Sequence, residues 1–161
     1  MARLSLLVLI GFWINTFSFA QQEAPTAVDE VLEQCLANAD VGSCAGVWVE
    51  QCLDDALTTV DVLNCYSTEL SFWEARMSDH LAELEGLYAE QDMHEDASRA
   101  LAPRLVVYQA RWREWRAAKC AFEYDKFRGG SIGRITLADC QLGETAQRVE
   151  KLQSLREEAG F

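Results

Sequence analysis

A pair of glycines near the C-terminal end constrains the fold most strongly, because it separates two segments that both have helical periodicity. Gly129 and Gly130 can end one helix, and Ser131 can cap the next. Cys120 lies ten residues before Gly130, and Cys140 lies ten residues after it. Two positions equidistant from the turn of an antiparallel helical hairpin lie at the same height, so a disulfide can join them. The spacing predicts a hairpin closed by a bond between Cys120 and Cys140.

The other four of the six cysteines lie in the N-terminal half of the chain. An even number in an exported chain indicates three disulfides, although composition alone leaves 15 possible pairings. Cys44 and Cys52 are about 12 Å apart by helix rise, too far for a bond. Short connections favour Cys35 with Cys44 and Cys52 with Cys65, each closing a corner between two helices. A metal cluster would need CxxC pairs or a histidine close by, and the sequence has neither at these cysteines.

The first 20 residues have the pattern of a signal peptide. Arg3 precedes an apolar run over residues 4–14, and Ser18-Phe19-Ala20 forms a small-x-small cleavage site. We expect cleavage after Ala20, which leaves residues 21–161 as a single helical domain in the periplasm or secreted. The apolar run is shorter than the roughly 20 residues of a spanning helix, and the cut is not followed by a cysteine that could carry a lipid. We therefore expect a soluble protein without a stable membrane anchor.

The rest of the sequence predicts an all-α protein, a small bundle stapled by disulfides. Strand patterns are weak, and Pro25 and Pro103 are the only prolines. We expect short helices over 28–39 and 45–57 and a long helix capped by Thr58 or Thr59, followed by the two helices of the hairpin, the first beginning at Pro103. The seam predicted for the long helix consists of Leu63, Tyr66, Leu70, Trp73, Met77, His80, Leu84 and Leu87. The core stripe predicted for the next helix consists of Leu105, Tyr108, Trp112, Trp115 and Phe122.

Charge divides the chain into two unequal parts. Residues 21–100 contain 18 acidic and two basic residues, a net charge of −16, whereas residues 101–161 contain eight acidic and 11 basic residues, a net charge of +3. Nucleic acid is a poor partner for such a chain, because phosphate binding needs a dominant basic surface. The acidic part either keeps the protein soluble or attracts a cationic partner.

Catalysis has little support in the sequence. His80 on the helical seam could be a ligand or a base, but a histidine at the edge of the bundle with satisfied ring nitrogens is the simpler interpretation. His94 could join Asp92 or Glu95 at a metal, although an exposed linker with one imidazole is usually only solvated. The acidic residues fall in no recognisable catalytic motif. We expect a binding protein rather than an enzyme, with no catalytic, cofactor or metal site.

The C-terminal hairpin resembles the LprI-like family, which is named for a mycobacterial lysozyme inhibitor. The resemblance rests on the Gln109-Ala110-Arg111-Trp112, Trp115-Arg116-x-x-x-Cys120, Arg128-Gly129-Gly130-Ser131-Ile132, Cys140 and Thr145-x-x-Arg148-x-x-x-Leu152 motifs. It covers residues 108–155, and residues 52–73 fit as well through Cys52, Thr59, Cys65, Leu70 and Trp73. Cys35 and Cys44 are an addition to the family pattern.

The resemblance implies a helical domain outside the cytoplasm that inhibits a lysozyme by protein–protein binding. Animal-type lysozymes are strongly cationic with an acidic cleft, so an inhibitor would gain from an acidic body and a small basic projection. The candidate projection is the turn that contains Arg128, Gly129, Gly130, Ser131 and Arg134. The same turn could be a passive connection. The alternative function is an envelope interaction or assembly module with a partner other than lysozyme.

Overall fold

The computed structural model describes residues 26–160, and every regular element within them is a helix. The predicted all-α class is confirmed. The predicted signal peptide falls on residues outside the described part of the chain. The six helices are α1 Ala27–Leu36, α2 Val41–Cys44, α3 Val47–Leu53, α4 Thr59–Asp92, α5 Ala102–Asp125 and α6 Ser131–Ala159.

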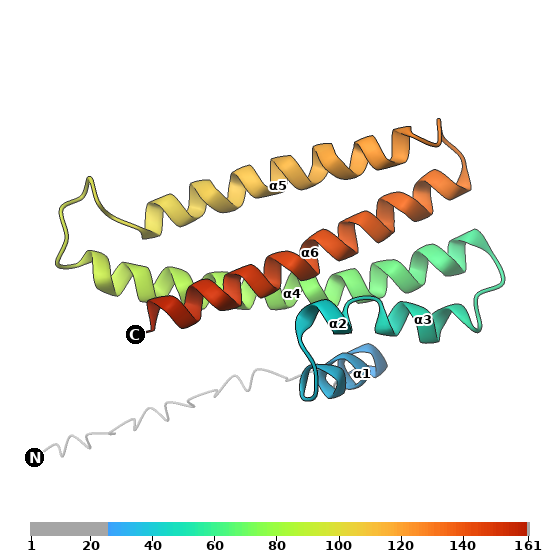
Figure 1. Cartoon of the computed structure of the whole chain (residues 1–161), viewed down its shortest axis with the longest axis horizontal. Coiled ribbons are helices and arrows are strands. Elements are labelled where there is room, and N and C mark those ends of the chain that lie inside the picture. Colours follow the sequence, from blue (N-terminus) through green and yellow to red (C-terminus); the bar gives the residue numbers. More distant parts are fainter. Residues whose placement is uncertain (1–25, 161) are drawn as a thin grey trace, which may run out of the picture.

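Three long helices form the body of the molecule. α6 packs along both α4 and α5, whereas α4 and α5 contact each other much less. Figure 1 shows α6 between these two helices, with the short helices α1–α3 against α4 and α6 on the side away from α5. The last helix of the chain is therefore the central one. The buried apolar core is made of Val28, Leu32, Val41, Cys44, Val49, Trp73, Met77, Leu84, Leu105, Leu142, Ala146, Val149 and Leu152.

The long helix α4 begins and packs as the sequence predicts. Thr58 is the N-cap, and it forms a capping box with Asp61. Trp73, Met77 and Leu84 of the predicted seam are buried. The seam is buried from Trp73 to Leu84, whereas Leu63, Tyr66, Leu70 and Leu87 are half-buried.

Two predicted boundaries in the N-terminal half are wrong. The first short helix ends at Leu36, and α3 spans only Val47–Leu53 within the predicted 45–57. Between them lies an unpredicted single turn, α2, which is capped by the side chain of Asp40 accepting from the Ser43 backbone at 2.7 Å. Disulfides between such short segments replace the stability that longer helices would supply.

The predicted core stripe of α5 is wrong for most of its members. Leu105 is buried and Trp112 is half-buried, but Tyr108, Trp115 and Phe122 are exposed. The reason is that α5 packs mainly on one neighbour, α6, which covers only a narrow strip of its surface. That strip is more polar than expected and includes Gln109 and Arg116.

The three predicted disulfides are confirmed. Cys35 is bonded to Cys44, and Cys52 is bonded to Cys65. The third bond joins Cys120 on α5 to Cys140 on α6, whose Cα atoms are 5.5 Å apart. The described chain contains no free cysteine.

Candidate partner-binding site

The turn between α5 and α6 has a backbone conformation that its two glycines favour. Arg128, Gly129 and Gly130 have φ values of 50°, 94° and 91°, all in the left-handed region. Glycine adopts this region without steric cost, whereas a side chain is strained there. The N-cap of α6 is Gly130, not the predicted Ser131, which is instead the first helical residue. The chain therefore reverses direction within very few residues.

Contacts on both sides of the turn hold it in place. The ring of Tyr124 on α5 lies against Gly133 on α6, where an added Cβ would be only 3.1 Å from Tyr124 Cδ2. A larger residue than glycine at position 133 would push the two helices apart. The bond between Cys120 and Cys140 joins the same helices slightly farther from the turn. The turn is thus a braced projection rather than a loose loop.

Most of the predicted partner-binding residues lie on the outer surface of this end of the hairpin. The side chains of Arg128, Ser131 and Arg134 are exposed, together with those of Phe127 and Ile132. Arg134 lies one helical turn into α6, beside a shallow hollow that α4 also lines. The two arginines therefore flank the projection rather than forming a single contact point. We refer to residues 127–134 as the hairpin tip.

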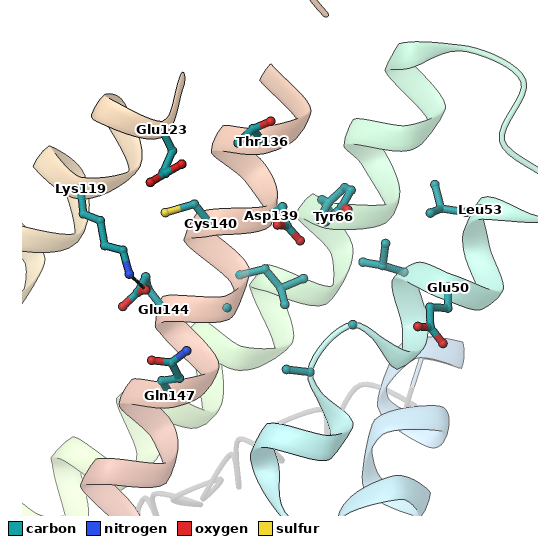
Figure 2. Close-up of a pocket in the computed structure, with 15 residues that line it drawn as sticks. Glu50, Leu53, Tyr66, Lys119, Glu123, Thr136, Asp139, Cys140, Glu144 and Gln147 are labelled. Atoms are coloured by element: carbon teal, nitrogen blue, oxygen red, sulfur yellow. Dashed lines mark hydrogen bonds and ion pairs between the residues drawn. The ribbon is translucent and has the colours of Figure 1, made fainter. Parts of the chain in front are cut away.

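An acidic groove of about 560 Å³ lies below the tip, between α3, α5 and α6 (Figure 2). Its carboxylates come from three helices: Glu50 on α3, Glu123 on α5, and Asp139 and Glu144 on α6. Lys119 forms an ion pair with Glu144, which is buried and exposes only 8% of its surface. Glu123 pairs with Lys126, and Glu50 and Asp139 leave the groove negatively charged.

Tyr66 of α4 forms part of the floor of this groove. Burial and then the negative charge of Asp139 raise the pKa of the Tyr66 hydroxyl, so the phenol stays protonated and can donate. Sequence reasoning missed the groove, since its carboxylates are dispersed along the chain from Glu50 to Glu144. Nothing in the local spacing of these acids signals that they converge.

Two charged side chains inside the bundle join the helices that carry the site. Glu69 of α4 accepts hydrogen bonds from the backbone at the start of α3. The guanidinium of Arg148 on α6 lies 4.0 Å from the centre of the Tyr108 ring, and its Nε donates to Gln109 at 2.9 Å. Both charged side chains are buried. Only Arg148 has a signal in the sequence, since it lies in the motif that resembles the LprI-like family.

His94 is exposed as predicted, whereas His80 is buried more deeply than the predicted position at the edge of the bundle. His80 is buried, with Nδ1 3.2 Å from a guanidinium nitrogen of Arg156, and His94 is exposed just after α4. Burial, and then the positive charge of Arg156, lower the pKa of His80. Within residues 26–160, no three His, Cys, Asp or Glu side chains lie close enough to hold a metal ion. In the same part of the chain, no helix has the length and apolar character needed to cross a membrane.

Comparison with known proteins gives one match. The sequence model of a family described as lysozyme inhibitor LprI matches residues 50–152. The matched region begins in α3 and ends in α6, so it includes α4, α5, the hairpin tip and two of the three disulfides. No curated protein and no solved structure matches the chain.

Proposed function

The chain belongs to the lysozyme inhibitor LprI family, and from this premise we propose that it binds a cationic lysozyme and inhibits it through the hairpin tip. The family and the disulfides both suggest a protein that works outside the cytoplasm. Inhibition is by binding, and no step of it requires a catalytic residue of this chain.

The braced hairpin tip is the observation that supports this proposal most. Arg128 is held at a positive φ on an exposed turn, and a ring contact and a disulfide fix the two helices behind it. A projection that is already ordered loses little conformational entropy on binding, which favours affinity. The cleft of a lysozyme contains two catalytic carboxylates, which a guanidinium can pair with. The positive charge of the tip arginines complements the negative charge of such a cleft.

The acidic body supports the same partner. Residues 21–100 have a net charge of −16, and the acidic groove lies directly below the tip. Opposite charges on two proteins speed their encounter and orient them before contact. The body would thus attract a cationic lysozyme, and the tip would enter its cleft.

The first test measures binding of the purified protein to an animal lysozyme at increasing salt. Exposed charges are screened within about 30 Å at 0.01 M salt and about 8 Å at 0.15 M. We expect association to slow steeply over this range, while dissociation changes less. Inhibition of cell-wall lysis should weaken in parallel.

The second test distinguishes the contribution of the tip arginines to binding from that of the total charge. Arg128→Ala with Arg134→Ala should speed dissociation by about tenfold or more, because contacts in a cleft are lost. Arg99→Ala with Arg111→Ala removes the same charge away from the tip, and both of these side chains are 74% exposed. This control pair should leave the dissociation rate unchanged.

An unchanged lysis rate at low salt and in molar excess of the protein would refute the inhibitor proposal. A module that docks on another envelope protein would then be the better interpretation of the tip. Capture of partners from envelope extract, with the Arg128→Ala and Arg134→Ala protein as control, would identify it.

We infer further that residues 1–20 are removed on export and that residues 21–161 act as one domain. The three disulfides support an oxidising compartment. Sequencing the N-terminus of the exported protein tests this, and any start other than Gln21 would contradict the expected cut.

A further inference from the structure

One face of α5 alternates cationic and aromatic side chains along its whole length. The spacing runs in steps of three and four residues, which places all seven positions on one side of the helix. These positions, here called the α5 stripe, are Arg104, Tyr108, Arg111, Trp115, Lys119, Phe122 and, at the C-cap, Lys126. No acidic residue occupies the stripe. By helix rise, it extends over about 33 Å.

The aromatic members of the stripe are exposed to an unusual degree. The exposed fractions are 44% for Tyr108, 49% for Trp115 and 65% for Phe122. Large aromatic side chains that are exposed together on a folded domain mark a surface that contacts something else. The core of the molecule does not use them, since α6 packs on the neighbouring strip of α5.

Cations lie over the rings of the stripe. The Lys119 ammonium is 5.1 Å from the centre of the Trp115 ring, and the Lys126 ammonium is 6.0 Å from that of Phe122. The Arg148 guanidinium covers the ring of Tyr108. With a cation over one face of each ring, stacking of a nucleobase or a sugar is hindered, and the ring edges remain open to an apolar medium.

The stripe belongs to the helix at the edge of the molecule opposite α1–α3, and of its members Lys119 also lines the acidic groove. Figure 1 shows α5 along one edge and α1–α3 along the opposite one. The net charge of −16 belongs to residues 21–100, which include α1–α4, and α5 belongs to the part with a net charge of +3. Such a charge distribution turns α5 toward a negative surface and the acidic helices away from it.

We propose that the α5 stripe docks the protein on an anionic phospholipid membrane, lying flat in the plane of the headgroups. The cations meet lipid phosphates, for which Arg111, Lys119 and Lys126 exchange their glutamate partners. The three rings insert at the interface, where tyrosine and tryptophan are favoured. The stripe ends at Lys126, next to the hairpin tip, but shares no residue with it, so docking can be tested apart from the proposed lysozyme binding. A membrane-bound molecule would still present its acidic side to the surrounding fluid.

The test uses protein purified from the extracytoplasmic fraction, with its N-terminus verified by mass spectrometry. Sedimentation with unilamellar vesicles should show binding to phosphatidylglycerol and little binding to phosphatidylcholine at about 0.01 M salt. On addition of the anionic vesicles, tryptophan fluorescence should shift to the blue. The shift should be absent in Trp115→Phe, because Trp48, Trp73 and Trp112 are half-buried or buried already.

Variants of the stripe, compared with matched controls, test whether the stripe is the surface that binds vesicles. Arg111→Gln should weaken vesicle binding about fivefold, the effect of one basic residue at a charged surface. Arg99→Gln is the control, since Arg99 is equally exposed and also pairs with a glutamate of its own segment. Trp115→Ser with Phe122→Ser should weaken binding about tenfold or more through lost apolar contact. Leu57→Ser, at a 92% exposed leucine outside the stripe, should have no effect.

The proposal is overturned if phosphatidylglycerol vesicles bind no protein at low salt, or if the stripe variants and the controls bind alike. A further experiment measures binding of the same variants to heparin, a soluble anionic glycan. Stripe-dependent binding to heparin without binding to vesicles would also overturn the membrane proposal and would favour an anionic polymer as the partner.

Discussion

The carboxylate of Glu69 on α4 holds the N-terminus of α3, with its Oε2 atom 2.9 Å from the backbone nitrogen of Val49. The other oxygen accepts from the backbone nitrogen of Gly46 at 2.6 Å and from Trp73 Nε1 at 2.9 Å. Glu69 is completely buried. Its charge is balanced by the unpaired N–H groups and the positive end of the helix dipole. One side chain thereby fixes the position of α3 relative to α4.

Replacing Glu69 by alanine should destabilise the protein by about 3 kcal/mol, because three buried donors lose their acceptor. Glu69→Gln should cost less, since the amide oxygen still accepts. Urea unfolding measures both. Glu85→Ala, at an exposed position of the same helix, should stay within about 0.5 kcal/mol of the unmodified protein. A Glu69→Ala protein as stable as this control would refute the capping role.

Removing the bond between Cys120 and Cys140 should cost about 3 kcal/mol through the 20-residue separation that it closes. We expect the Cys120→Ala, Cys140→Ala protein to unfold at lower urea and to remain helical by circular dichroism. Thiol titration of the unmodified protein under denaturing, non-reducing conditions should find no free thiol. Two or more reactive thiols would contradict the disulfide framework.

Replacing Arg148 by lysine should cost about 2 kcal/mol despite the conserved charge. The planar guanidinium stacks on Tyr108 and donates through Nε to Gln109, and an ammonium cannot do both in the same geometry. Lys151→Arg, at an exposed position of α6, is the matched control. Equal unfolding midpoints for the two variants would show that stacking contributes little.

His80 should make stability depend on pH below neutrality. Its pKa in the folded protein lies below the ordinary 6.5, because of burial and then of the charge of Arg156. The charges of Arg76, Glu83 and Asp79 also act on the ring. The unfolded chain then binds a proton at higher pH than the folded one, so stability falls as pH drops below 6.5 through the folded pKa.

Thermal unfolding from about pH 8 to 5 tests this prediction. In His80→Gln the fall in melting temperature should be smaller over that interval. The pKa of Glu83 is lowered from 4.5 by Arg156, so its own contribution is lost only at more acidic pH. Identical pH profiles for the two proteins would show that His80 does not titrate differently on folding.

Gly133→Ala should destabilise the hairpin by about 1–3 kcal/mol, the usual cost of overpacking. The new Cβ would meet the Tyr124 ring and also the Tyr124 carbonyl oxygen at 3.2 Å, and a backbone atom cannot move aside freely. Gly143→Ala on the same helix meets nothing within 4 Å and should be neutral or stabilising. Unfolding midpoints compare the two.

The sequence predicted those features that depend on local spacing. The hairpin and its disulfide follow from the equal distances of Cys120 and Cys140 from Gly130, and the start of α4 follows from the capping residue Thr58. The mistaken burial of Trp115 and Phe122 has a tertiary cause. Helical periodicity identifies a face, but the position of α6 decides which side of α5 it covers.

The acidic groove and the buried Glu69 could not be predicted for a related reason. Glu69 is one of many acids in its half of the chain, and its partners are backbone groups 20 and 23 residues away. Sequence patterns contain no signal for a carboxylate that caps another helix. The proposed binding role of Arg128 and Arg134 remains a prediction.

The central place of α6 has a consequence for the time at which the chain can fold. α6 is synthesised after α4 and α5, yet these two helices pack on α6 more than on each other. Until residues 131–159 have emerged, α4 and α5 share only a small surface on which to bury their apolar sides. A chain that crosses a membrane from its N-terminus would therefore complete its core only after residues 131–159 had passed through.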